Sequence, residues 1–478
     1  MGVIIDCLMG KKEEVYDSMK IYENSIIIPN KESPGVSAFK SIKNSFFYNI
    51  VIVSNQLLMT TNLILLGHLL YEKKIHYDLF MTYQIGVFIL ELFGKVFFLG
   101  LLKYLFDEKD ENRIFLGMKT LYAVLIPVIL IPLSLVSYYI IKLLFHYNLE
   151  LYDHHIIKEV WIKFLIFTPA IYLFELLFHL NIQFLTYLKR QRTVFFYLIF
   201  FFIAHITLSF ILLYVLEIGI IGLTISYFVN SFLFYCFTNN TIKKERNYDE
   251  TDSFFFLIPY KQNFNSEFLK LLKKKSYTSL INYGDVIAIH LLFIATLFTN
   301  KTQLIVNIIY INFYELICAV NKGFYYNLKN YIWEKMEDAD YKQKYVKVFS
   351  FYFILITLTI FLVLIFIKNI LLDSYLFEGG EIILKNVSNQ LRIIYPICLL
   401  IMGIRMNLNG IIRGMSVALH PLKKIFYIAV YMILCYLICF YLGFEICGLW
   451  ISLFIFDIFL VLESIHKAKT LFPAFFHS

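Results

Sequence analysis

Long apolar stretches separated by short polar breaks fill most of the chain, from about residue 45 to residue 465. A helix of about 20 apolar residues can cross a bilayer, whereas a strand of a membrane β-barrel needs only about 9–11 residues of alternating polarity. The pattern therefore predicts an all-α membrane protein with twelve transmembrane helices. The predicted spans cover residues 46–71, 79–106, 117–145, 159–181, 194–215, 219–238, 277–298, 303–328, 346–372, 390–412, 424–443 and 446–465.

Composition agrees with this class. The 478 residues are 59% hydrophobic and 16% charged, whereas a soluble domain has about 45–50% apolar and about 25% charged residues. The first 44 residues are mixed and charged, so we expect no removable signal peptide. The cysteines show neither a CxxC pair nor a zinc-binding spacing, and we expect no metal site.

The basic residues predict the orientation. Lys and Arg gather at the N-terminus and in alternate loops, for example at 189–192, 243–246 and 270–275. This asymmetry places both termini in the cytoplasm, of either a plasma-membrane or an organellar protein. The net charge of +8 is then explained by topology and by contact with the lipid bilayer, so a nucleic-acid partner need not be invoked.

An internal repeat divides the chain into halves. Gly222–Ser226 reads GLTIS near the end of the first half, and Gly448–Ser452 reads GLWIS near the end of the second. Glu217-Ile218 and Glu445-Ile446 precede the two copies. We expect two six-helix bundles related by a pseudo-two-fold axis along the membrane normal. The predicted divisions are an N-terminal segment (1–44), the first bundle (45–238), a cytoplasmic linker (239–276), the second bundle (277–465) and a tail (466–478).

Short motifs in this framework resemble a known family. Leu66–Leu69 contains a Gly-His-Leu sequence at the end of span 1, and Asn409–Gly414 reads NGIIRG at the end of span 10. Leu442–Trp450 carries Leu-Gly followed by Gly-Leu-Trp at the entry to span 12, and Tyr314–Leu316 lies in span 8. In this order, the motifs resemble those of the multidrug and toxic compound extrusion (MATE) family, and the eukaryotic branch most closely.

The resemblance implies a secondary transporter whose span 7 couples substrate to protons through two acidic residues five positions apart. Asp285 and His290 have that spacing in this chain. Ionisable groups at this depth are costly, and they usually mark a substrate or ion path. Burial favours the neutral form of a carboxyl group, and imidazole loses its proton near neutral pH. The alternative is that the two side chains hold helices together.

Two positions in span 10 depart from the family pattern. The acidic residue of that span falls on Met402, and Arg405 follows one turn later. A positive group in place of a negative one would weaken the binding of organic cations. The substrate class and the coupling of the family are therefore open for this chain.

Other polar groups within the spans are candidates for the same role. Glu175 and His179 are four residues apart, which places them on one face of a helix, as a proton relay or a packing pair. Glu315 is a candidate cavity carboxylate, or else a partner of Arg405 or Lys322. Asn55 and Gln56 could bond a substrate or neighbouring helices.

We expect a proton-coupled or sodium-coupled antiporter that exports small organic or cationic compounds by alternating access. We expect no enzyme activity, no cofactor besides H⁺ or Na⁺, and no use of ATP, since the sequence contains no phosphate-binding GxxxxGK[ST] loop. Two alternatives remain: a flippase for lipid-linked oligosaccharides, favoured by Arg405 and Lys95, and a degenerate membrane protein that no longer transports.

Overall fold

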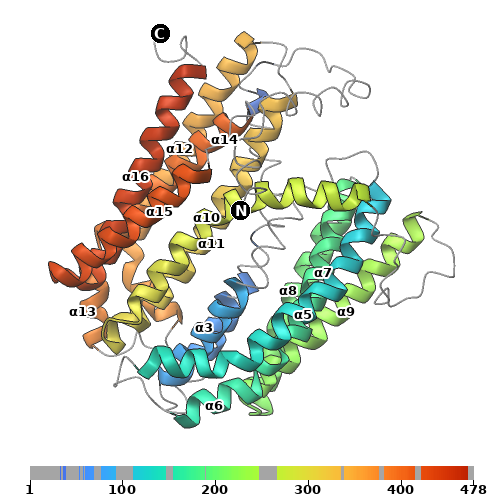
Figure 1. Ribbon diagram of the computed structural model, residues 1–478, viewed down its shortest axis with the longest axis vertical. Coiled ribbons are helices and arrows are strands. Elements are labelled where there is room, and N and C mark those ends of the chain that lie inside the picture. The colour runs from blue at the N-terminus through green and yellow to red at the C-terminus, as the bar shows by residue number, and fades with distance from the viewer. Residues whose placement is uncertain are drawn as a thin grey trace.

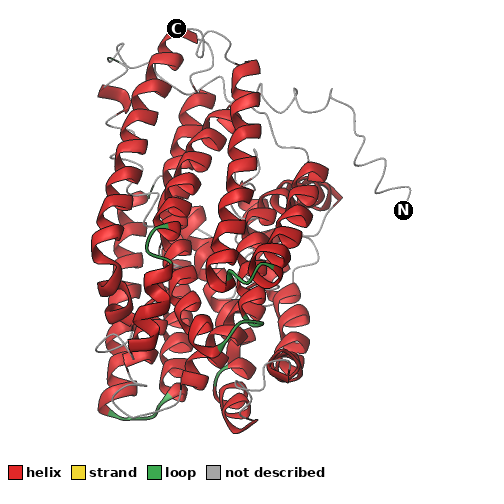
Figure 2. Ribbon diagram, turned by 90° about the vertical axis from the view of Figure 1, so that its left-hand side faces the viewer, coloured by secondary structure: helices red, strands yellow, loops and turns green. Residues whose placement is uncertain are grey.

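The computed structural model describes most of the two predicted bundles. It covers residues 33, 36–38, 53, 57–58, 60–68, 77–92, 111–146, 154–188, 190–246, 266–334, 339–375, 382–414 and 421–471. For some of these residues, 274–287 among them, only the backbone is described. The described part of the chain is helical and contains no strand (Figure 2).

The first half begins with the partly described helix that includes residues 60–68. It continues with α3 (Tyr77–Leu90), α5 (Glu111–His146), α6 (His154–Lys163), the 3₁₀ helix η4 (Leu165–Phe167), α7 (Thr168–Tyr187), α8 (Gln191–Phe210), the π-helical turn η5 (Ile211–Val215) and α9 (Ile220–Arg246).

The second half has the same order of elements. It comprises α10 (Ser266–Thr296), α11 (Lys301–Glu334), α12 (Ala339–Tyr375), α13 (Ile382–Gln390), α14 (Ile394–Gly414), α15 (Pro421–Cys435), the π-helical turn η8 (Tyr436–Tyr441) and α16 (Glu445–Leu471).

All twelve predicted spans contain described helical residues, and the all-α membrane fold is confirmed. Among the described residues, eight helices are long and apolar enough to cross a membrane, and two shorter apolar helices cover Leu79–Leu90 and Phe426–Tyr441. The predicted linker 239–276 is helical at both ends, since α9 runs to Arg246 and α10 begins at Ser266. Residues 247–265 lie outside the described part.

The fourth predicted span is not one continuous helix. It breaks between α6 and α7, where η4 intervenes and Pro169 lies in the first turn of α7. Proline fits there because its missing N–H has no partner at the start of a helix. The second half breaks in the same way, at a turn of residues 391–393 between α13 and α14.

The repeat predicted from the sequence extends to individual backbone hydrogen bonds. The offset that carries Gly222 onto Gly448 also carries Ile211 and Leu216 onto Leu437 and Leu442. The amide of Leu216 donates to the carbonyl of Ile211 over 2.9 Å, and the amide of Leu442 donates to the carbonyl of Leu437 over 2.9 Å. The first residues of α7 and α14 are related by the same offset. Each π-helical turn is therefore part of the duplicated unit.

The turn after each π-helical segment shows which residues of the two halves are equivalent. With the same offset, Glu217 is equivalent to Gly443 and Gly219 is equivalent to Glu445. All four have positive φ, with values of 53°, 71°, 70° and 47°. The two glutamates that precede the repeated motifs are therefore not equivalent; the backbone geometry is duplicated, and the residues that adopt it are exchanged.

Two glycines allow the last helix of each bundle to approach the π-helical turn. A Cβ on Gly222 would lie 2.9 Å from the Cβ of Leu212, and one on Gly448 would lie 2.7 Å from the Cα of Cys439. These distances are shorter than van der Waals contact, so the repeated Gly-Leu motif is explained by close packing of α9 and α16.

The two bundles form the arms of a V (Figure 1). In the first arm α7 packs against α5 and α9, and in the second arm the equivalent α14 packs against α12 and α16. The arms come together at the end where α3, α6 and α13 lie, and α3 contacts α11 there. They separate toward the opposite end, which is the end predicted to face the cytoplasm, and the first turns of α10 cross from one arm to the other there.

Candidate functional site

Glu175 and His179 lie on one face of α7, inside the first bundle. The exposed fraction of Glu175 is 0%, and the hydroxyl of Tyr227 on α9 donates to its Oε2 over 2.8 Å. His179 Nε2 is 3.7 Å from Glu175 Oε1. The spacing of four residues thus brings an imidazole and a carboxylate together, and a tyrosine from a neighbouring helix completes the group.

A histidine that the sequence analysis did not single out continues this group. The ring of His205 on α8 has its centroid 5.5 Å from that of Tyr227, and its Nε2 lies 2.6 Å from Oδ1 of Asn62. His205 and Asn62 are both buried. We call Asn62, Glu175, His179, His205 and Tyr227 the N-bundle cluster; it joins four helices. The sequence signal for His205 was a single ionisable residue within span 5.

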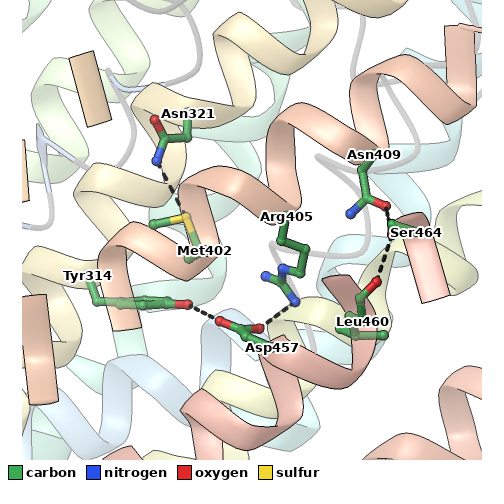
Figure 3. A network of polar contacts seen from close by, with 8 residues as sticks. All are labelled: Tyr314, Asn321, Met402, Arg405, Asn409, Asp457, Leu460 and Ser464. Carbon is green, nitrogen blue, oxygen red and sulfur yellow. Dashed lines mark hydrogen bonds and ion pairs between the residues drawn. The ribbon is translucent and has the colours of Figure 1, made fainter. Parts of the chain in front are cut away.

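The second bundle contains a buried ion pair between α14 and α16 (Figure 3). Arg405 Nη1 lies 2.9 Å from Asp457 Oδ1, and the hydroxyl of Tyr314 on α11 donates to Asp457 Oδ2 over 3.3 Å. The exposed fractions of Arg405 and Asp457 are 2% and 0%. We call these three residues the C-bundle cluster. Its carboxylate is Asp457, which the sequence analysis did not propose as a partner of Arg405.

The two clusters occupy related places in the repeat. The repeat offset carries His179 onto Arg405, on the equivalent helices α7 and α14, and each lies next to a buried carboxylate. The carboxylates differ in origin, since Glu175 is on α7 itself and Asp457 is on α16. In both bundles a tyrosine hydroxyl donates to the carboxylate.

The position at which the family resemblance implies an acidic residue is apolar and enclosed. Met402 is fully buried, and its sulfur accepts a hydrogen bond of 3.5 Å from Asn321 Nδ2. Figure 3 shows Met402 one turn before Arg405 on α14. Because Asp457 balances Arg405, this arginine is not an uncompensated positive charge.

His290 lies where the two bundles meet. Its exposed fraction is 4%, and its ring centroid is 4.5 Å from that of Phe88 on α3. Phe88 also stacks on Phe293 of α10, with centroids 4.2 Å apart. A titratable side chain of the second bundle is thus packed against the first bundle.

A hydrogen bond forms a second link between the bundles. The hydroxyl of Thr60, in the first helix, donates to Oδ1 of Asn312 on α11 over 2.8 Å. We call Thr60, Phe88, His290, Phe293 and Asn312 the bundle contact.

The other candidates can be placed only in part. Asp285 lies on α10, but only its backbone is described, and Asn55 and Gln56 lie outside the described residues. Glu315, next to Tyr314 on α11, is half-buried, and Arg405 has Asp457 as an ion-pair partner. Within the described residues, no group of three or more His, Cys, Asp or Glu side chains could hold a metal ion.

These geometries define what the clusters can do. Carboxylate and imidazole groups inside an apolar bundle can exchange protons and can compensate a bound cation. The described residues thus contain one such cluster in the first bundle and one histidine in the bundle contact, whereas the carboxylate of the C-bundle cluster is already balanced by Arg405. The N-bundle cluster, the C-bundle cluster and His290 all lie on helices of the two bundles, so they would move with the bundles.

Comparisons with known proteins bear on the fold. No protein-family model matches the chain, and no curated protein matches its sequence. Among solved structures, the eukaryotic MATE transporter AtDTX14 superposes with a TM-score of 0.69 at 11% identity, over 90% of this chain and 95% of that chain.

Two further solved structures give the same result. An inward-facing multidrug resistance MATE family transporter of the MOP superfamily has a TM-score of 0.61 at 12% identity, over 90% of this chain and 95% of that chain. A MOP superfamily transporter from Pyrococcus furiosus, for which reversed polarity of the binding pocket suggests a different function, has a TM-score of 0.58 at 13% identity, over 94% of this chain and 98% of that chain. The chain has the divergent form of the MATE transporter fold that its motifs predicted.

Proposed function

We propose that this protein is a proton-coupled antiporter that exports small organic compounds by alternating access between its two bundles. Sodium is the alternative coupling ion. One observation carries the proposal: His290, a titratable group, lies in the contact that must open if the bundles are to expose a site to the other side. Protonation and bundle movement would then act at the same place.

The coupling would follow from competition between two cations for one negative site. Asp285 lies five residues before His290 on α10, about 7.5 Å along the helix axis. A proton taken up at either group would reduce the attraction for a cationic substrate and favour its release on the outer side. The substrate, when bound from the cytoplasm, would displace the proton in turn.

The N-bundle cluster would take part as a second proton-exchanging group. Tyr227 on α9 donates a hydrogen bond to Glu175 and packs its ring against His205, so titratable groups of α7 and α8 lie on either side of one tyrosine. The same contacts would serve a purely structural role if the cluster never changed its protonation state. A proton-exchanging cluster would contribute to the pH dependence of transport, whereas a structural cluster would not.

The pairing of Arg405 with Asp457 bears on the substrate class. An arginine whose charge is balanced by a carboxylate would repel organic cations less than a free arginine. The positive charge of Arg405 is therefore a weaker argument against the cationic substrates of the family. The pairing also leaves less support for a lipid-linked oligosaccharide flippase, because one of the two cations in its favour already has a counter-charge. The other, Lys95, lies outside the described residues. The reversed pocket polarity of the Pyrococcus furiosus transporter is therefore not proposed for this chain.

Transport in vesicles tests the proposal. Purified protein in liposomes with an imposed pH gradient should accumulate a fluorescent organic cation against its own gradient, and the rate should collapse when a protonophore removes the pH difference. A matched experiment with a sodium gradient at uniform pH identifies the coupling ion. If neither gradient drives any flux while the protein remains folded, the antiporter proposal is wrong and a non-transporting role is favoured.

A further inference from the structure

The first turns of α10 do not belong to a membrane span. The apolar run of span 7 begins near residue 277, but α10 begins at Ser266. We call Ser266–Lys275 the basic arm; its sequence, SEFLKLLKKK, contains four lysines and one acidic residue, Glu267. The arm therefore joins the predicted cytoplasmic linker to the second bundle and carries a net positive charge.

One face of the basic arm is anchored to the first bundle. Phe268 is 3% exposed, and its ring covers Gly117 of α5 so closely that a Cβ there would lie 2.8 Å from the ring. Leu271 and Leu272, three and four residues later, are partly buried against the core. This spacing is that of one helical face, so the arm is held in a fixed orientation.

The opposite face of the arm is open. Ser266, Leu269, Lys270 and Lys273 are exposed, and Leu269 is 48% exposed. The four positions follow the i, i+3, i+4, i+7 pattern, so they share one face. An exposed leucine flanked by lysines, directly before a membrane span, is the chemistry of a helix that lies in the headgroup region of a bilayer.

We propose that the exposed face of the basic arm binds the anionic phospholipid headgroups of the cytoplasmic leaflet. Lys270 and Lys273 would contact phosphate groups, and Leu269 would enter the boundary with the acyl chains. Polybasic segments on the cytoplasmic side of a transmembrane helix are attracted to anionic lipid in this way. Because Phe268 fixes the arm to α5 while α10 continues into the second bundle, bound lipid would touch a segment shared by both bundles. The inference does not depend on transport.

Lipid binding by the full-length protein tests this inference. The probe is a fluorescent phosphatidylglycerol added to protein in zwitterionic micelles, with fluorescent phosphatidylcholine as the neutral lipid. The unmodified protein should bind phosphatidylglycerol more tightly. Lys270→Gln combined with Lys273→Gln should raise the Kd about thirtyfold, because each lysine near an anionic surface contributes about a factor of five. Binding of phosphatidylcholine should not change.

The matched control removes two lysines from the other end of the molecule. Lys158→Gln with Lys385→Gln, on α6 and α13, lowers the net charge equally and should leave the Kd unaltered. If the double variant of the arm does not fold, each single variant should show about a fivefold loss.

Three outcomes would overturn the inference. They are equal binding of the two lipids by the unmodified protein, equal losses in the arm and control variants, and full competition by glycerol phosphate. The last of these would identify a site for free phosphate instead of a lipid surface.

Discussion

At the scale of single residues, the buried ion pair of the second bundle shows how two charges can be accommodated among apolar helices. Arg405 and Asp457 come from different helices, and both are almost completely removed from solvent. Removing water from two charges is costly, and their attraction balances this cost only while both are present. A single substitution that breaks the pair should therefore be far more harmful than replacing both members.

Asp457→Asn should lower the free energy of unfolding by about 3–5 kcal/mol, because Arg405 would remain buried without its counter-charge. The measurement is equilibrium unfolding of the purified protein in detergent micelles. Arg405→Met combined with Asp457→Leu provides the control and should be much closer to the unmodified protein. If the single variant is as stable as the double variant, the pair does not contribute as described.

Glycine packing gives a second prediction at this scale. Gly448→Ala should lower the free energy of unfolding by about 1–3 kcal/mol, since its Cβ would meet backbone atoms of Cys439 that cannot rotate away. Gly86→Ala is the comparison, because its Cβ would meet the terminal carbons of the Leu165 side chain at 2.6 and 2.7 Å. That side chain can adopt another rotamer, so Gly86→Ala should cost less. The opposite order of thermal stabilities would contradict this explanation.

The sequence allowed contacts within one helix to be predicted, but not contacts between different helices. Glu175 and His179 could be paired because helical periodicity relates residues four apart. Asp457 could not be paired with Arg405, because the two lie on different helices with a third helix, α15, between them in the chain. His205 drew no attention because its neighbours in the cluster, Asn62 and Tyr227, come from other helices. Contacts between helices depend on how the helices rotate and tilt, which hydropathy does not specify.

At the scale of elements, the turns that follow the two π-helical segments repeat a backbone conformation with exchanged residues. Glycine adopts positive φ at little cost, whereas a residue with a Cβ is strained there. Each turn contains one glycine and one glutamate in this conformation. Each bundle therefore retains one strained residue and one unstrained residue, in opposite order.

Gly443→Ala should lower the free energy of unfolding by about 1 kcal/mol, because φ at this position is +71°. Among the described residues, apart from the two chain neighbours of Gly443, no atom lies within 4 Å of the added Cβ, so the effect reports backbone strain. At the equivalent position in the first bundle, Glu217→Gly should leave stability equal or slightly higher. Melting temperatures of the two variants test this, and no loss in Gly443→Ala would refute the strain.

Hydropathy predicted the twelve spans because each must present an apolar surface about as long as the bilayer is thick. It could not predict the break of the fourth span into α6, η4 and α7, since a hydropathy average does not report where the backbone ends one helix and begins the next. Pro169 lies in the first turn of α7, where a proline suits the start of a helix. The repeat was visible in sequence only at its closing motif, although the backbone follows it over much of the chain.

At the scale of the whole molecule, two similar bundles meet at one end and separate at the other (Figure 1). The hydrogen bond between Thr60 and Asn312 joins them, beside the packing of Phe88 on His290 and Phe293. If the protein works by alternating access, this contact must break in each transport cycle. A covalent link across it should stop the cycle without unfolding either bundle.

Thr60→Cys combined with Asn312→Cys should allow a short bifunctional thiol reagent to join the bundles, because the native side chains are 2.8 Å apart. Transport in vesicles should fall to background after cross-linking with a reducible reagent and return when a reductant cleaves the link. Thr60→Cys alone serves as the control for reaction at native cysteines. Full transport with the link intact would exclude movement at this contact.

The most direct test of the central claim is the pH dependence of transport after removal of the ionisable groups of α10. In vesicles with an imposed pH gradient, Asp285→Asn and His290→Gln should each reduce proton-driven export at least tenfold and flatten its dependence on pH. His154→Gln, which changes an exposed histidine of α6, should transport like the unmodified protein. Unchanged rates and an unchanged pH profile in both α10 variants would contradict the account.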